Sequence, residues 1–142
     1  MTIAAILGRK GESVISIEQG STVREAVTRL AGNRIGALPV TRDGEVIGVL
    51  SERDIVYCLE SESGAVLDLP VDKVMTTPAI TVAPDVPILA ALSQMSAKRI
   101  RHLPVVDRGR LVGIVSIGDL VAWRIARIEE EAEAMRAYIQ SA

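Results

Sequence analysis

The sequence repeats itself with an offset of 65 residues. The run Arg-Ile-x-x-Leu-Pro-Val begins at Arg34 and again at Arg99, and a Gly-hydrophobic-hydrophobic-Ser run ends at Ser51 and again at Ser116. One register without gaps over so much of the chain indicates a tandem duplication. Each copy has about 60 residues, close to the smallest size that buries a stable core by itself. The two copies are therefore predicted to pack against each other through their sheets.

Each copy is predicted to contain strand, helix, strand, strand and helix, in that order. The evidence is a β-branched run, apolar residues at helical spacing, a hairpin turn at Asp43-Gly44 or Arg108-Gly109, and a helix directly after the repeated serine. The expected elements are 14–17, 23–30, 37–41, 46–50 and 52–59 in the first copy, and 79–82, 86–96, 102–106, 111–115 and a helix from 117 in the second. The predicted fold class is mixed α/β (α+β), with the two repeats related by pseudo-two-fold symmetry.

Four units follow from this pattern. Residues 1–60 are predicted to form the first repeat with an N-terminal segment, 61–72 a linker containing a short helix, 73–124 the second repeat, and 125–142 a C-terminal helical extension. In this extension and the turn before it, apolar residues recur at spacings of four and three, which is typical of a helix that packs against a partner helix. They are Val121, Ile125, Ile128, Ala132, Met135 and Ile139. A terminal helix folded back on its own domain is the alternative.

Composition argues against several classes of protein. The only aromatic residues are Trp123, Tyr57 and Tyr138, and the net charge is −2, so neither base stacking nor a basic nucleic-acid surface is expected. One cysteine, Cys58, and one histidine, His102, predict no disulfide framework and no metal site. With no nucleophile–base constellation, an enzyme is not expected.

The N-terminus resembles no signal peptide, because its basic residues follow the apolar stretch. No uncharged apolar run approaches the ~20 residues that a membrane span needs. We therefore expect a cytoplasmic protein that does not contact membranes.

The repeated serine is followed three residues later by aspartate, at Asp54 and at Asp119. A serine where a strand meets a helix places its hydroxyl and the first free N–H groups of the helix beside an anion. The aspartate lies one helical turn later on the same face and can accept hydrogen bonds from both hydroxyls of a ribose. Each residue also has a purely structural interpretation, because serine caps helices and a carboxylate is favourable near a helix N-terminus. Two copies in register favour nucleotide contact.

These motifs resemble those of the cystathionine β-synthase-type (CBS) domain, and the tandem pair resembles a Bateman module of the stand-alone bacterial type. The resemblance covers roughly residues 8 to 125. It implies AMP, ADP, ATP or a related adenosyl ligand bound in clefts between the repeats, and no catalytic cofactor. NAD(H), S-adenosylmethionine or a cyclic dinucleotide remain open, because ribose recognition is common to all of them.

The resemblance also implies that the ribose aspartate of one repeat faces the adenine-holding strand of the other. One site should then combine Ile114, Ser116 and Asp119 with Val14, Ile15, Ile35 and Gly36. The other should combine Val49, Ser51 and Asp54 with Ala79, Ile80, Ile100 and Arg101.

The resemblance also implies a basic side chain beside the phosphates. His102 follows the second adenine strand and is assigned to the Asp119 site, with a surface strand histidine as the alternative. The Asp54 site must use Arg53 or Arg101, and a solvated Arg53 is the alternative there. Arg34 and Arg99 are expected to end helices, where the helix dipole favours a cation. Because His102 falls on Ala37 in the repeat, only the Asp119 site is predicted to respond strongly to pH.

The predicted function is a regulatory module that senses adenine nucleotides, acts as a homodimer and signals to an unidentified protein target. The homodimer is implied by the way in which Bateman modules pair into flat discs. The alternatives are a structural dimerisation module without a ligand and a module that binds NAD(H) or S-adenosylmethionine.

Overall fold

Two equivalent β-hairpins form the centre of the molecule. The computed structural model describes residues 1–11 and 13–141. Strands β2 (Ala37–Arg42) and β3 (Glu45–Ser51) pair antiparallel, as do β4 (His102–Asp107) and β5 (Arg110–Ser116). Val40 lies opposite Gly48 and Val105 opposite Gly113, with a bulge after each valine. Residues that are 65 positions apart in the sequence thus occupy the same place in the hydrogen-bond register of the two hairpins.

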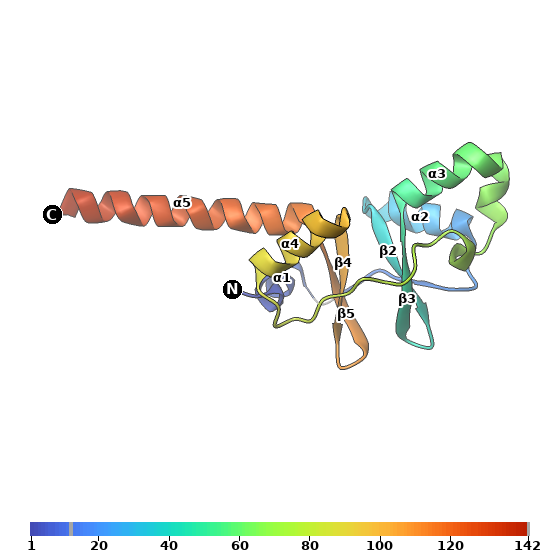
Figure 1. Ribbon diagram of the computed structural model, residues 1–142, viewed down its shortest axis with the longest axis horizontal. Helices are drawn as coiled ribbons and strands as arrows, with labels where there is room; N and C mark the ends of the chain where they lie inside the picture. The colour runs from blue at the N-terminus through green and yellow to red at the C-terminus, as the bar shows by residue number, and fades with distance from the viewer. Residues whose placement is uncertain (12, 142) are drawn as a thin grey trace.

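The hairpin turns explain why this register is the same in both copies. Asp43 and Gly44 have φ values of 52° and 84°, and Arg108 and Gly109 have 51° and 78°. Two consecutive residues with positive φ make the two-residue turn whose twist matches that of the strands it joins. Figure 1 shows the two hairpins side by side.

A helix follows each short first strand and each hairpin, as expected. Helix α2 (Val23–Asn33) is capped by the hydroxyl of Thr22, which accepts a hydrogen bond from Glu25 N. Helix α3 (Glu52–Glu62) follows β3, α4 (Ile88–Lys98) precedes β4, and α5 (Ile117–Ser141) follows β5. Arg34 and Arg99 end α2 and α4 in the left-handed conformation, with φ of 52° and 54°. The predicted mixed α/β fold class is confirmed.

The first strand of each copy is shorter than predicted. In place of 14–17, β1 (Ile17–Glu18) pairs parallel to β2, and in place of 79–82 there is a single bridge from Val82 to Val105. The carbonyl of Ser16 is taken by the Arg29 side chain, so it makes no strand bond. In the second copy Pro84 falls on Gln19 and has no N–H, so the hydrogen bond from Gln19 N to the Thr41 carbonyl has no counterpart and a single bridge remains.

Each repeat has a separate hydrophobic core, and the N-terminal segment belongs to the second. Helix α1 (Ile3–Lys10) places Ile3 and Ile6 in the core of the second repeat, beside Ile88, Leu103 and Leu120. The placement of this segment with the first repeat, within residues 1–60, was therefore wrong in this respect. Its backbone is tied to the same repeat, where Ile3 N donates to Val86 O and Ala4 N to Pro84 O.

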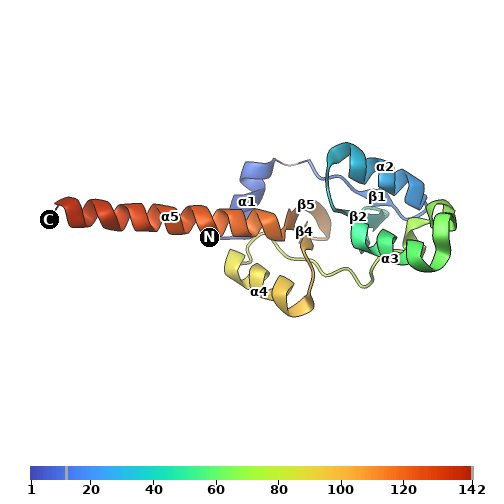
Figure 2. The ribbon, with the colours of Figure 1, turned by 90° about the horizontal axis from the view of Figure 1, so that it is seen from above.

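The linker closes the core of the first repeat. Its 3-10 helices η1 (Ser63–Asp68) and η2 (Val71–Lys73) bury Val66 and Val71 against α2 and β2. Helix α5 continues through residues 124–125 without a break and projects from the second repeat, which Figure 2 shows from above. No helix of the described residues combines the length and the low charge needed to cross a membrane.

Candidate functional site

Two cavities lie between the repeats, and each is lined by both of them. The first surrounds Asp54, and the second surrounds Asp119. The structure brings every predicted site residue to one of the two. The first cavity gathers Val49, Ser51, Arg53, Asp54, Ala79, Ile80, Ile100 and Arg101. The second gathers Val14, Ile15, Ile35, Gly36, Ile114, Ser116 and Asp119.

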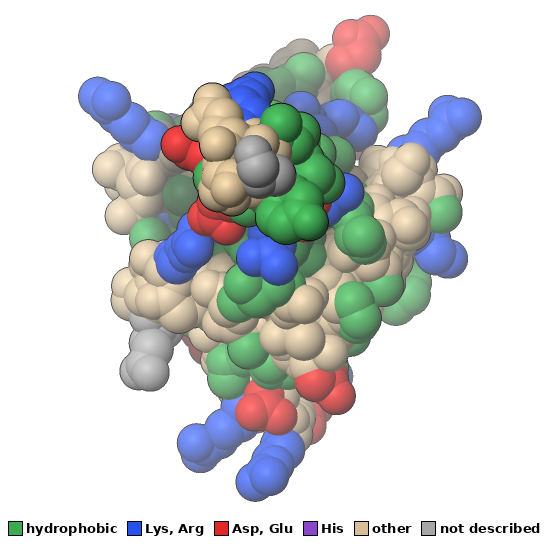
Figure 3. Space-filling view, turned by 90° about the vertical axis from the view of Figure 1, so that its left-hand side faces the viewer, with side chains coloured by type: hydrophobic (Ala, Val, Ile, Leu, Met, Phe, Trp, Pro, Cys, Tyr) green, Lys and Arg blue, Asp and Glu red, His purple; other side chains and the backbone are tan. Residues whose placement is uncertain are grey.

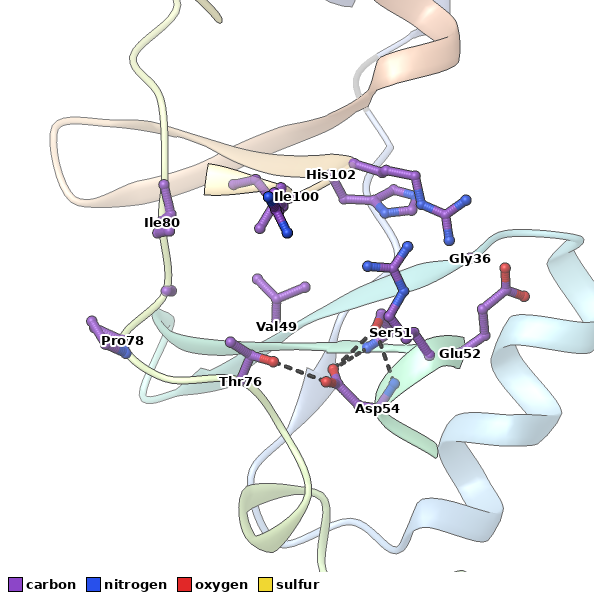
Figure 4. A pocket seen from close by; sticks show the side chains of 14 residues that line it. Gly36, Val49, Ser51, Glu52, Asp54, Thr76, Pro78, Ile80, Ile100 and His102 are labelled. Carbon is purple, nitrogen blue, oxygen red and sulfur yellow. Dashed lines mark hydrogen bonds between the residues drawn. The ribbon is translucent and has the colours of Figure 1, made fainter. Parts of the chain in front are cut away.

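Asp54 both caps α3 and faces the first cavity (Figure 4). Its Oδ2 accepts hydrogen bonds from Ser51 N at 2.9 Å and from Ser51 Oγ at 3.0 Å, and Asp54 N donates to Ser51 Oγ at 3.2 Å. Its Oδ1 accepts a hydrogen bond from Thr76 Oγ1 at 2.9 Å. Oδ2 therefore caps the helix, while Oδ1 accepts from a side-chain hydroxyl that a ligand hydroxyl can replace. The structural and the ligand-binding interpretations of this motif are compatible.

Apolar side chains from both repeats form the opposite part of the first cavity. Val49 of β3 points toward Ile100, which lies two residues before the start of β4, and Ile80 lies along the same side (Figure 4). An apolar slot of this kind accepts a flat ring, and the backbone beside it offers polar groups. The ring slot, with side chains from both repeats, and the Asp54 carboxylate therefore lie in one cavity.

Asp119 is engaged differently in the second cavity. Its Oδ2 accepts hydrogen bonds from Ser116 N and from Lys10 Nζ, both at 2.8 Å, and Lys10 Nζ also donates to the Ile114 carbonyl at 2.9 Å. Partial burial would raise the pKa of the Asp119 carboxyl, but the hydrogen bonds from Lys10 and Ser116 and the charge of Lys10 outweigh it and lower that pKa. A cation from α1 thus holds the carboxylate that was predicted to bind ribose.

His102 lines both cavities rather than the Asp119 cavity alone. It lies next to Gly36, where an added Cβ would be only 3.3 Å from the imidazole Cε1, so the absence of a side chain at Gly36 makes room for the ring. Burial, and then the charge of Arg101, lower the pKa of His102, against the opposing charges of Glu52 and Asp119. His102 thus lines the Asp119 cavity, to which it was assigned, and the Asp54 cavity as well, and its contact with a phosphate stays a prediction.

Several further residues at the cavities were not predicted to act there, among them four with polar or charged side chains. Thr76 and Arg99 line the first cavity, and Lys10 and Arg34 line the second. The two arginines do end helices, as expected, and their equivalence under the 65-residue offset could have suggested a shared second role. Thr76 and Lys10 lie outside the repeated motifs, so no pattern in the sequence marks them.

Comparison with known proteins identifies the two repeats. The family model of the CBS domain matches residues 10–61 and 71–126. The CBS domain-containing protein YhcV of Bacillus subtilis is 35% identical over 107 residues, covering 75% of this chain and 76% of the relative.

Solved structures of similar proteins share the fold. The CBS-domain protein ATU1752 of Agrobacterium tumefaciens has a TM-score of 0.83 at 34% identity and covers 87% of this chain and 99% of its own. The CBS domain protein PAE2072 of Pyrobaculum aerophilum, complexed with AMP, has a TM-score of 0.75 at 32% identity. The match covers 84% of this chain and 89% of that protein. The CBS domain pair of protein MJ0100, in complex with 5′-methylthioadenosine and S-adenosyl-L-methionine, has a TM-score of 0.80 at 26% identity. The match covers 89% of this chain and 98% of that one. The chain therefore belongs to the CBS-domain family, with one CBS domain in each of its two repeats.

Proposed function

We propose that this protein is a regulatory module that binds an adenosyl nucleotide, AMP or a close relative, in the two cavities between its CBS domains. The observation that carries the proposal is the Asp54 cavity, in which a carboxylate oxygen bound by a side-chain hydroxyl shares the cavity with an apolar slot formed by both repeats. A ribose replaces the hydroxyl of Thr76, and the adenine enters the slot. The relatives complexed with AMP, 5′-methylthioadenosine and S-adenosylmethionine support this ligand class.

Signalling follows from the position of the cavities. Each is lined by both repeats, so a ligand that binds there favours one arrangement of the two repeats over others. The protein acts as a cytoplasmic homodimer whose altered surface an unidentified protein target recognises. It binds nucleotides without converting them, and product formation during prolonged incubation with AMP, ATP or NAD(H) would contradict this.

The test is calorimetric titration with AMP of the wild type, Asp54→Ala, Asp119→Ala and the double variant. Charged hydrogen bonds of this kind contribute about 1.5–3 kcal/mol each, so each single variant should lose its own cavity's affinity at least tenfold. Undiminished AMP binding by the double variant would exclude the assignment.

Loss of a helix cap is a confounding effect in these variants, because both aspartates cap helices. Thr22→Ala is the matched control, since it removes the cap of α2 away from both cavities. It should lower stability by about 1 kcal/mol and leave AMP affinity unchanged.

A structural dimerisation module without a ligand is the second candidate, favoured by the capping role that Ser51 and Asp54 already fill. A thermal-shift screen decides between them. A ligand at 100 times its dissociation constant should stabilise the fold by about 2.7 kcal/mol, whereas a purely structural module shows no shift with AMP, ATP, S-adenosylmethionine or NAD(H).

A further inference from the structure

The projecting part of α5 is exposed along almost its whole length. Of the described residues beyond Ala126, all are exposed except Ala132, which is half-buried. The CBS-domain matches end at residue 126, so this segment lies beyond them. Among the described residues, its side-chain contacts are the surface pairs of Arg127 with Glu130 and with Glu131 and a hydrogen bond from Ser141 Oγ to the Tyr138 carbonyl. Surface ion pairs of this spacing contribute a few tenths of a kcal/mol each. A helix takes most of its stability from packing of an apolar face, so this one requires a partner.

One face of α5 has the spacing of a coiled coil. The α5 seam consists of the apolar residues spaced four and three apart: Val121, Ile125, Ile128, Ala132, Met135 and Ile139. Met135 and Ile139 are 61% and 65% exposed. In Figure 3, which looks onto the C-terminal end of α5, hydrophobic side chains gather on one side of the helix. This alternation corresponds to the d and a positions of a heptad repeat.

The α5 seam and the body of the protein occupy different sides of the helix. Leu120 is the buried residue of α5 and packs into the core of the second repeat. Val121 follows it by one position, which is about 100° around an α-helix. A second helix can therefore cover the seam without displacing the second repeat.

The charges beside the seam select a parallel pairing. With Ile125 at position a, the flanking g positions are Arg124 and Glu131, and the flanking e positions are Glu129 and Arg136. In a parallel two-stranded coiled coil, a g residue lies beside the e residue of the partner's next heptad. Arg124 then meets the partner's Glu129, and Glu131 meets the partner's Arg136. Both pairs are attractive, and each occurs twice.

The antiparallel alternative with full overlap, in which the whole α5 seam of one helix lies along the whole α5 seam of the other, is unfavourable. In antiparallel pairs g residues meet g residues and e residues meet e residues. Full overlap of the seam then places Glu131 beside the partner's Glu131 and Glu129 beside the partner's Glu129. Like charges at these positions destabilise the pairing by amounts similar to those that opposite charges contribute.

We propose that α5 forms a parallel, in-register two-stranded coiled coil with α5 of a second copy of this chain. The proposal rests on the homodimer of the proposed function and specifies its interface. It places both pairs of CBS domains at the same end of the coiled coil, so that nucleotide occupancy in one copy acts beside the other.

Disulfide trapping tests the orientation. In a Cys58→Ser background, Met135→Cys places two thiols at the same layer of a parallel seam, within disulfide reach. In the full-overlap antiparallel arrangement the two positions are about 15 Å apart, beyond that reach. Mild oxidation should convert most of the Met135→Cys protein to a covalent dimer, and Ala137→Cys, on the outer face, should give far less. Absence of the Met135→Cys dimer, or equal trapping at Ala137→Cys, would overturn the parallel coiled coil.

Charge reversal tests the register. Glu131→Arg alone places two arginines beside each other at two points in each dimer, and should raise the dimer dissociation constant on the order of tenfold. Adding Arg136→Glu restores both attractive pairs and should return the constant to near that of the wild type. Failure of this restoration would overturn the proposed register.

Light scattering of the wild type separates this proposal from the one on which it rests. A protein that stays monomeric at all concentrations would overturn the homodimer and the coiled coil together. A dimer that shows neither trapping at position 135 nor restoration by Arg136→Glu would overturn the coiled coil alone.

Discussion

Asp54 and Asp119 occupy equivalent positions in the two repeats, but their outer partners differ. Asp54 accepts from the neutral hydroxyl of Thr76, whereas Asp119 is bound by the ammonium of Lys10. A ribose hydroxyl can replace another hydroxyl at little cost, but it must compete with a charged hydrogen bond at Asp119. We therefore expect an uncharged nucleoside to bind more weakly in the second cavity than in the first.

Removal of the Lys10 charge should open the second cavity. In an Asp54→Ala background, Lys10→Met should strengthen adenosine binding about three- to tenfold, because adenosine carries no phosphate that could attract the displaced lysine. Calorimetric titration measures this, with Lys73→Met as the matched control. Weaker adenosine binding by Lys10→Met would instead make Lys10 a ligand contact.

His102 should make nucleotide phosphate binding depend on pH in both cavities. Because burial lowers its pKa, His102 is mostly neutral at pH 7, and a bound phosphate would favour the imidazolium form. AMP binding should therefore take up a proton and strengthen as pH falls below about 6.5. Titrations at several pH values in the Asp54→Ala and Asp119→Ala backgrounds, each with and without His102→Gln, isolate this effect from the titration of the phosphate itself. Equal pH dependence with and without His102 would exclude its role.

Folding stability without ligand should show the opposite trend from AMP affinity. A histidine whose pKa is lowered in the folded state binds its proton more readily in the unfolded chain. Its contribution is therefore present above about pH 6.5 and declines as pH falls toward the lower folded-state pKa.

At the scale of elements, the third strand of each repeat contains a glycine where another segment approaches closely. A Cβ at Gly48 would be 2.5 Å from Met75 Sδ and 2.9 Å from the Thr76 carbonyl, and a Cβ at Gly113 would be 2.5 Å from Leu7 Cδ2. The Thr76 backbone is held by reciprocal hydrogen bonds with Val49 at 2.8 and 3.1 Å. The flexible side chain of Leu7 can move away from an added Cβ at Gly113, whereas the hydrogen-bonded backbone of Thr76 cannot move away from one at Gly48.

Substitution of the two glycines should therefore have unequal effects. Gly48→Ala should lower the free energy of unfolding by about 1–3 kcal/mol, whereas Gly113→Ala should cost clearly less, since only the end of Leu7 must move. Urea denaturation compares the two directly, and each serves as the control for the other. Equal losses would show that the position of Thr76 adjusts as readily as that of Leu7.

At the scale of the whole molecule, the chain forms two cores joined across the two cavities and one long helix beyond them. Helix α1 leaves the first repeat to complete the second core, so its lysine reaches the second cavity. Helix α5 begins at the capping motif of Ser116 and Asp119 and ends far from both cores. A ligand in the second cavity thus touches the elements that lead to the proposed dimer interface.

Charges placed in the α5 seam should separate the dimer. Ile125→Glu with Ile128→Glu buries four carboxylates in an apolar interface, which should raise the dissociation constant at least a hundredfold. Sedimentation or light scattering over a range of concentrations measures it. Ala134→Glu with Ala137→Glu adds the same charge on the outer faces and should leave the dimer intact. Equal behaviour of the two double variants would remove the seam from the interface.

The local features of this fold could be predicted from the sequence, because short-range rules decide them. The hairpins at Asp43-Gly44 and Arg108-Gly109, the helix after Ser51 and the grouping of site residues around Asp54 and Asp119 all agree with the structure. Turn chemistry and side-chain periodicity act within a few residues, and because the chain is duplicated, each of these patterns occurs twice in the sequence. The contacts of the site residues with a nucleotide stay a prediction.

Tertiary structure alone decided which side chains complete each cavity. Lys10 reaches Asp119 from 109 positions away, and Thr76 reaches Asp54 from 22 positions away, although neither belongs to the repeated motif. His102 serves both cavities because the two repeats meet at Gly36. These contacts depend on how the α1 helix and the linker pack against cores formed elsewhere in the chain. Packing between distant segments minimises exposed apolar area over the whole molecule, so no local pattern in the sequence records it.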